Sequence, residues 1–131
     1  MIAQFRAEGT EVRVLNVVEW PQDLPAALAF TPGAMAGGPI MDLHEETRRQ
    51  AEELLARTAQ RLRAASFGVS QEMREGDARQ GILECAAEWR PDVIVLGSHG
   101  RTGLDRVLLG SVSENVMRHA TCSVEVIRGV P

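Results

Sequence analysis

The residues of clearest chemical interest lie between 97 and 113, in the stretch "GSHGRTGLDRVLLGSVS". Glycine reaches positive φ easily, and successive amides in such turns can surround an anion. Gly97, Gly100 and Gly103 could supply those amides. Residues 111–114, S-V-S-E, match a capping box, which predicts that a helix starts at Ser111 with its positive dipole end facing the same anion. The stretch therefore predicts a phosphate site that needs no lysine.

Alternatives remain open for three features of this stretch. The glycines could serve only to let the chain turn. His99 could contact phosphate or could stabilise a turn in contact with solvent, and Arg101 could screen phosphate charge or point to water.

The composition excludes several classes of function. All 14 basic residues are arginine, so the chain has no lysine for a Walker A phosphate loop or for a Schiff base. The GxGxxG pattern of dinucleotide enzymes is absent, so hydride transfer is not supported. A net charge of -4 provides no basic surface for nucleic acid or for an acidic membrane.

Metal and covalent chemistry also find little support. Cys85 and Cys122 are far apart and form no CxxC pair, so we interpret both as small core residues. His119 and Cys122 have HxxC spacing, but two ligands do not make a zinc site. No catalytic residue and no metal site are predicted.

Strands and helices alternate along the chain. The patterns predict strands at 11–18, 67–76, 92–97 and 123–128, and helices at 42–65, 77–90 and 111–119. Asp77 and Gln80 are predicted to cap the second of these helices. Such alternation predicts one α/β domain with a parallel sheet, and the glycine-rich stretch follows the carboxyl end of a strand, where these sheets bind ligands. Strands 11–18 and 92–97 are apolar enough to be buried on both faces.

The sequence also predicts one long loop and the apolar faces of the first two helices. Residues 19–41 hold several prolines and glycines and are expected to form a long flexible loop, either a lid over a site or a surface excursion. The apolar residues expected to face the core are Leu43, Ala51, Leu54, Leu55 and Leu62 in the first helix and Ile82, Leu83, Ala86 and Trp89 in the second.

The spacing Gly97-x-x-Gly100, nine residues, Gly110-Ser111 resembles the G-2x-G-9x-G(S/T) nucleotide motif of the universal stress protein family. The similarity is dense over 76–128 and looser over 7–20. It implies a parallel-sheet fold of Rossmann-like or flavodoxin-like type, similar to the adenine nucleotide alpha hydrolases, which holds ATP with or without Mg²⁺. The motif positions carry over to Gly97, Gly100, Gly110, Ser111, Val112 and Ser113, with Val17 near adenine and with His99 and Arg101 as added candidates.

The chain departs from the family pattern at its start. Family members open with a strand, an aspartate that meets adenine, and a helix, whereas "MIAQFRAEG" resembles only the end of that helix, with Gly9 as its stop. We therefore expect an N-terminally truncated sheet without its central strand and with weaker selection of the base. Met1 would then be an internal or misassigned start; alternatively, the sheet closes differently or another chain supplies the strand.

The resemblance implies a regulatory stress-response protein that binds ATP or a related adenine nucleotide, with slow hydrolysis at most. It also implies a homodimer formed through the last strand, 123–128, although Glu125 interrupts that apolar run. The alternative is a dimeric interaction module of the same fold that binds no nucleotide. No signal-peptide pattern and no membrane-spanning apolar run are present, so the cytoplasm is the expected location.

Overall fold

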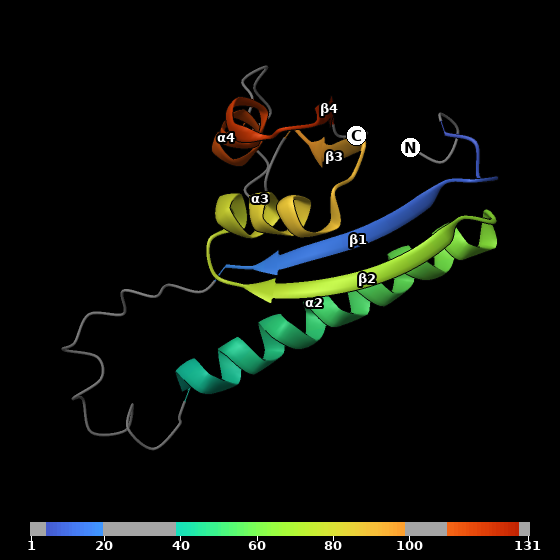
Figure 1. The fold of residues 1–131 in the computed structure, drawn as a ribbon. Helices are drawn as coiled ribbons and strands as arrows, with labels where there is room; N and C mark the ends of the chain where they lie inside the picture. The colour runs from blue at the N-terminus through green and yellow to red at the C-terminus, as the bar shows by residue number, and fades with distance from the viewer. Residues whose placement is uncertain (1–4, 20–38, 99–109, 129–131) are drawn as a thin grey trace. The chain divides into compact units, whose positions relative to one another are not determined.

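The computed structural model describes residues 5–19, 39–98 and 110–128. These residues form two compact units, one ending at Gly76 and one beginning at Asp77. Both units combine parallel strands with helices, as the sequence predicts (Figure 1).

The first unit contains a pair of parallel strands and one long helix. Strand β1 (Glu11–Val18) pairs with β2 (Gly68–Glu75) in a register that runs from Glu11 opposite Gly68 to Val18 opposite Glu75. Helix α2 (Pro39–Ala64) connects the two strands and packs along them (Figure 1). The predicted strand, helix and parallel pairing of this half are thereby confirmed.

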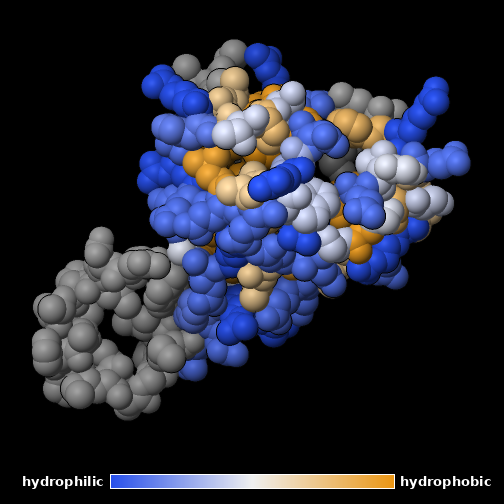
Figure 2. All heavy atoms as spheres, viewed as in Figure 1, coloured by the Kyte–Doolittle hydropathy of each residue, from blue (hydrophilic) through white to orange (hydrophobic). Residues whose placement is uncertain are grey.

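Helix α2 buries one narrow stripe. The buried residues recur every three or four positions, as an amphipathic helix requires; they are Ala51, Leu55, Ala59 and Leu62. Leu43 and Leu54 are 62% and 46% exposed, so their prediction as core residues is wrong. Each helical residue turns about 100° from the one before it, which carries Leu54 away from the sheet that Leu55 faces. Figure 2 shows mainly hydrophilic side chains on the part of α2 in view.

Two boundaries in this unit differ from the prediction. Helix α2 begins at Pro39 rather than Asp42, so residues 39–41 of the predicted loop are helical, and the remainder, 20–38, lies outside the described residues. A proline suits the first helical position because its missing N–H would have no helical partner. Gly9 has a φ of +78° but belongs to a turn in which Thr10 N–H donates to Ala7 O, and not to the end of a helix.

The second unit is built from α3 (Ala78–Trp89), β3 (Val93–Gly97), α4 (Ser111–His119) and β4 (Ser123–Ile127). Strands β3 and β4 are parallel, in a register that begins with Val93 opposite Ser123. Helices α3 and α4 pack against each other. Asp77 caps α3 by accepting a hydrogen bond from Gln80 N–H at 3.2 Å, as the sequence predicts. The predicted elements of this half are confirmed within about two residues.

The strands are less buried than their apolar sequences suggest. Only Val18 of β1 is fully buried, and the apolar residues of β3, Val93 to Leu96, are half-buried. The expected burial on both faces is therefore wrong. Among the described residues, β1 pairs only with β2 and β3 pairs only with β4, so each strand lies at an edge.

The predicted inner face of α3 is only partly right. Its buried residues are Gly81 and Cys85, and the four predicted apolar residues are half-buried. Cys85 is buried and Cys122 half-buried, so the core assignment holds fully for the first cysteine alone. No helix in the described part of the chain is long and apolar enough to cross a bilayer.

Candidate functional site

The start of α4 is joined to the end of β3 by main-chain hydrogen bonds. Gly110 N–H donates to Ser98 O at 2.9 Å, and Ser98 N–H donates to Ile127 O at 2.8 Å. The two ends of the glycine-rich stretch therefore meet where the strand ends, as ligand binding in a parallel sheet requires. The predicted ligands His99, Gly100 and Arg101 lie outside the described residues.

Helix α4 has no side-chain cap at its start. Its N-cap residue is Gly110, with φ -62° and ψ 155°, and the first helical residue is Ser111. The predicted capping box is therefore wrong, because a box needs its serine at the N-cap rather than inside the helix. The Glu114 carboxylate instead pairs with Arg118 at 2.8 Å.

The missing cap matters for anion binding. The first amides of a helix, here those of Ser111, Val112 and Ser113, have no acceptor within the helix, and no described side chain caps them. The positive end of the helix dipole adds to their attraction for negative charge. The start of α4 can therefore offer main-chain N–H groups to a phosphate without any lysine.

Ser113 is buried at 4% exposure and is used inside the protein. Its Oγ donates a 2.7 Å hydrogen bond to the carbonyl of Gly97, the last residue of β3. The hydroxyl proton is thus committed to the fold, and the main-chain N–H is the group that Ser113 can offer to a ligand. Of the predicted candidates, the structure brings together Gly97, Gly110, Ser111, Val112 and Ser113.

Val17, the predicted neighbour of adenine, is the penultimate residue of β1 and is half-buried. It lies opposite Arg74 in the β1–β2 register. Val17 belongs to the first unit, whereas the other described candidates belong to the second.

Ser98 is a residue that the sequence analysis did not single out. It is 5% exposed, and its Oγ has no hydrogen-bond partner among the described residues. The sequence signal that could have identified Ser98 is its hydroxyl side chain directly after the apolar run "VIVLG". A polar side chain that is buried there needs a hydrogen-bond partner.

A second feature of this unit lies away from the predicted site. An open groove of about 540 Å³ separates parts of α3 and α4. None of the predicted nucleotide ligands lines it; the lining residues are Asp77, Arg79, Gln80, Leu83, Glu84, Asn115 and His119. The hydrogen bond from the Arg79 guanidinium, and then that from Gln80 N–H, lowers the pKa of Asp77 to about 2.

His119, considered above with Cys122, contacts its own helix. Its Nδ1 lies 2.9 Å from Asn115 O and must carry the proton to bond that carbonyl. Within the described ranges, no three histidine, cysteine or carboxylate side chains gather as metal ligands.

Comparison with known proteins identifies relatives of this chain. The profile of the universal stress protein family matches residues 1–128. Universal stress protein MJ0531 of Methanocaldococcus jannaschii is 34% identical over 96 residues, which are 73% of this chain and 56% of that protein. Universal stress protein Sll1388 of Synechocystis is 33% identical over 109 residues, which are 82% and 71% of the two chains. The chain thus matches little more than half the length of the first relative.

Solved structures resemble the fold. The structure of MJ0577 from Methanocaldococcus jannaschii superposes with a TM-score of 0.77 at 25% identity and covers 99% of this chain and 83% of that one. A universal stress protein family protein from Arabidopsis thaliana, solved with AMP bound, has a TM-score of 0.61 at 21% identity and covers 92% and 65%. The second likeness concerns the fold alone. From the profile match and the relatives together, this chain belongs to the universal stress protein family.

Proposed function

We propose that this protein binds ATP or a related adenine nucleotide at the start of α4 and acts as a regulatory protein of the stress response in the cytoplasm. The observation that supports this most directly is the uncapped first turn of α4, held against the carboxyl end of β3 by the Gly110–Ser98 hydrogen bond. The amides there are suited to phosphate oxygens.

Each candidate residue has a role in this proposal. The main-chain N–H groups of Ser111, Val112 and Ser113 bind phosphate, and Gly97 and Gly110 keep side chains away from it. Gly100, His99 and Arg101 extend the same phosphate contacts, and Val17 packs beside adenine. Mg²⁺ that accompanies ATP would offset part of the phosphate charge.

The comparisons support an adenine nucleotide but not a particular one. The Arabidopsis protein of similar fold was solved with AMP bound, which indicates that this architecture accommodates an adenosine phosphate. Nothing in the described residues assigns a general base or a nucleophile, so we propose slow hydrolysis at most.

The test is to purify the protein without added nucleotide, denature it, and analyse the released small molecules. ATP and AMP are then titrated calorimetrically with and without Mg²⁺. We expect bound adenine nucleotide or measurable affinity, and loss of both in Gly110→Val, whose side chain would project where phosphate approaches. Circular dichroism checks that the variant folds. A protein that carries no nucleotide and gives no binding heat would refute the proposal.

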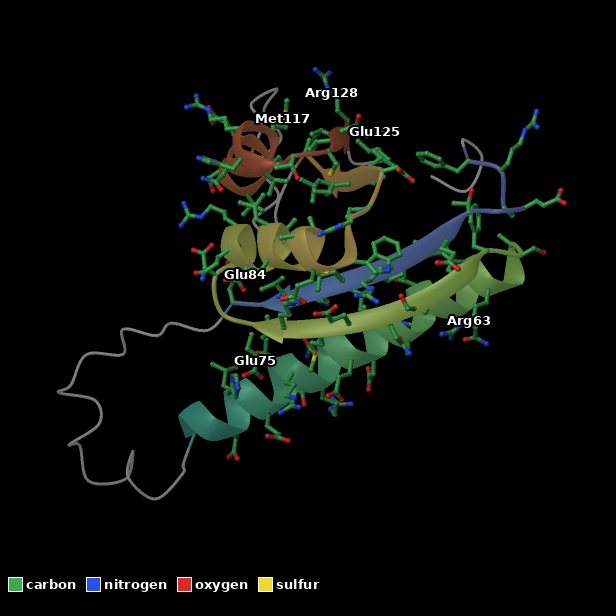
Figure 3. All side chains as sticks on the ribbon, viewed as in Figure 1. Arg63, Glu75, Glu84, Met117, Glu125 and Arg128 are labelled. Carbon is green, nitrogen blue, oxygen red and sulfur yellow. The ribbon has the colours of Figure 1, made fainter. Side chains whose placement is uncertain are left out.

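We also propose a homodimer formed through the outer edge of β4, residues 123–128. Among the described residues β4 pairs only with β3, so its other edge is available. Figure 3 labels Glu125 on this strand and Arg128 just after it. Both charges flank the edge and could limit pairing. If dimers form without nucleotide binding, the alternative function as an interaction module gains support.

The β3–β4 register provides a selective test of this edge. Ile127 O accepts from Ser98, so the main-chain groups of Ile127 face β3 and those of Val126 face outward. Val126→Pro removes an outward N–H and should yield monomers by light scattering while nucleotide binding persists. Ile127→Pro is the control, because it breaks the β3 pairing and should unfold the unit. An unchanged dimer in Val126→Pro would exclude this interface.

A further inference from the structure

We infer that the groove between α3 and α4 binds a small aliphatic primary amine in its charged, ammonium form. The inference does not depend on the nucleotide site proposed above, because none of the residues proposed to bind nucleotide lines this groove. The volume of the groove, about 540 Å³, is within the usual range of small-molecule sites.

The charges that line the groove favour a cation. Asp77 and Glu84 are acidic, and Arg79 is basic. The Arg79 guanidinium donates to both oxygens of the Asp77 carboxylate, from Nε at 3.3 Å and from Nη2 at 2.9 Å. The charges of Asp77 and Arg79 therefore offset each other, and the negative charge of Glu84 remains in excess. This excess charge attracts a cationic ligand and repels an anionic one.

The hydrogen-bonding groups of the groove favour a ligand that donates. The Gln80 side chain uses its amide N–H to donate to Glu84 Oε1 at 2.7 Å. An ionised carboxylate can only accept, and each of its oxygens accepts more than one hydrogen bond, so Glu84 can also accept from a ligand. The side-chain donors of Arg79 and Gln80 are directed to neighbouring carboxylates, which leaves the groove rich in acceptors.

His119 adds an acceptor whose identity is fixed by its own helix. Its Nδ1 lies 2.9 Å from Asn115 O, and a carbonyl can only accept, so Nδ1 carries the proton. Nε2 of the neutral ring is then an acceptor. Asn115 lines the groove one turn earlier in α4 and contributes an amide oxygen. The three acceptor groups of Glu84, His119 and Asn115 equal in number the three N–H donors of a primary ammonium ion.

Leu83 supplies an apolar contact beside these acceptors. It lines the groove and is half-buried. A short aliphatic chain can lie against Leu83 while its ammonium group stays with the polar side chains, as lysine side chains do on protein surfaces. A bare metal ion would gain nothing from Leu83, and the described residues contain no cluster of three histidine, cysteine or carboxylate ligands.

The experiment follows the backbone amide NMR signals of the protein as n-butylammonium chloride is added at about pH 7.5, where histidine is mostly neutral. We expect millimolar affinity, as is usual for so small a ligand, with shifts centred on residues 77–84 and 115–119. Butyltrimethylammonium is the ligand control, because it has the same charge and chain but no N–H group. It should bind at least about tenfold more weakly, since it forms no hydrogen bond to the charged carboxylate.

Two pairs of variants test the residues. Glu84→Gln removes the excess charge and should weaken butylammonium binding about tenfold. Glu88→Gln removes the same charge one turn later in α3, outside the groove, and should change the affinity less than about twofold. His119→Asn keeps an N–H near the position of Nδ1 but has no acceptor at that of Nε2, so it should bind several-fold more weakly than His119→Gln, whose amide oxygen reaches the Nε2 position.

Three results would overturn the inference. Equal affinity for the primary and the quaternary ion would mean that charge alone attracts them. Equal losses in Glu84→Gln and Glu88→Gln would mean that the general charge of α3, and not the groove, is responsible. An absence of shifts in the groove at about 100 mM butylammonium would mean that the groove binds no amine, because even very small ligands bind a formed site at that concentration. None of these results bears on ATP binding, so the proposed function would stand.

Discussion

The Ser113 hydroxyl donates a 2.7 Å hydrogen bond to the carbonyl of Gly97 and so ties the first turn of α4 to the last residue of β3. The donor is buried at 4% exposure, while the acceptor residue lies at the exposed end of its strand. This bond and the one from Gly110 N–H to Ser98 O hold the helix start at the end of the sheet, where its amides can act together.

Ser113→Ala tests that tie. The variant should lose about 1 kcal/mol of unfolding free energy, the usual net value of one such hydrogen bond, as measured by urea denaturation. Nucleotide affinity should also fall, because the start of α4 is held less firmly. Ser111→Ala, at an exposed position of the same turn, serves as the stability control and should change the unfolding free energy little. Equal stability losses in the two variants would show that the bond to Gly97 adds nothing.

Gly110→Asp tests whether the open amides of α4 bind the ligand. Gly110 has an extended backbone that any residue can adopt, and aspartate there would accept hydrogen bonds from the first turn. The free protein should gain a few tenths of a kcal/mol and melt about 1–2 °C higher, yet lose ATP binding because the carboxylate occupies the amides and repels phosphate.

Gly110→Asn separates these two causes, since asparagine caps as well as aspartate without the charge. It should share the gain in stability and retain more affinity than Gly110→Asp. Undiminished ATP binding by the aspartate variant, measured by calorimetry, would argue that phosphate lies elsewhere.

Adjacent leucines in α2 test the packing of the first unit. Leu55 is 8% exposed and Leu54 46% exposed. Leu55→Ala should cost about 2–4 kcal/mol of unfolding free energy, the usual cost of truncating a buried leucine. Leu54→Ala should cost less than about 1 kcal/mol, because much of its side chain is already in water. Similar losses in urea denaturation would mean that Leu54 is covered in solution, for example by a second copy of the chain.

Asp77 should make the stability of α3 depend on pH in the acid range. The Arg79 hydrogen bond lowers its pKa from 3.8 to about 2, so the folded state favours the ionised carboxylate. The stabilisation is therefore complete above pH 3.8 and is lost as the pH falls toward 2.

Asp77→Asn keeps an N-cap acceptor but removes the charge, so it isolates this effect. At neutral pH the original protein should melt at the higher temperature. The difference in melting temperature between the two should shrink between pH 3.8 and 2, since the other carboxylates are the same in both. A constant difference across that range would mean that the Arg79 contact does not persist in solution.

The repeating patterns of the sequence predicted the elements well. Apolar runs, and alternating apolar and polar residues in the case of β2, predicted the four strands, and three-to-four residue spacing predicted the three helices within a few residues. Asp77 was correctly identified as a cap, because its type and position relative to Gln80 suffice for that bond. These features depend on residues that are close together in the chain, so a single sequence is enough to predict them.

Burial and the capping of α4 could not be predicted in the same way. Leu54 and Leu55 are equally apolar, and only the position of the sheet decides which is covered. The S-V-S-E pattern fits a capping box with Ser111 as its N-cap, yet Ser111 is the first helical residue and Gly110 is the N-cap. Local pattern leaves such one-residue alternatives nearly equal in energy, and packing selects between them.

By itself the sequence determined the family, the parallel α/β architecture and the spacing of the glycines, since these follow from residue types and intervals along the chain. Only the tertiary structure decided that the amides of α4 are uncapped, that Ser113 is committed to Gly97, and that Ser98 is buried without a partner. Each of these features depends on which groups come into contact when β3, α4 and β4 pack. A hydrogen bond needs both a donor and an acceptor, and here the two come from segments that are far apart in the sequence.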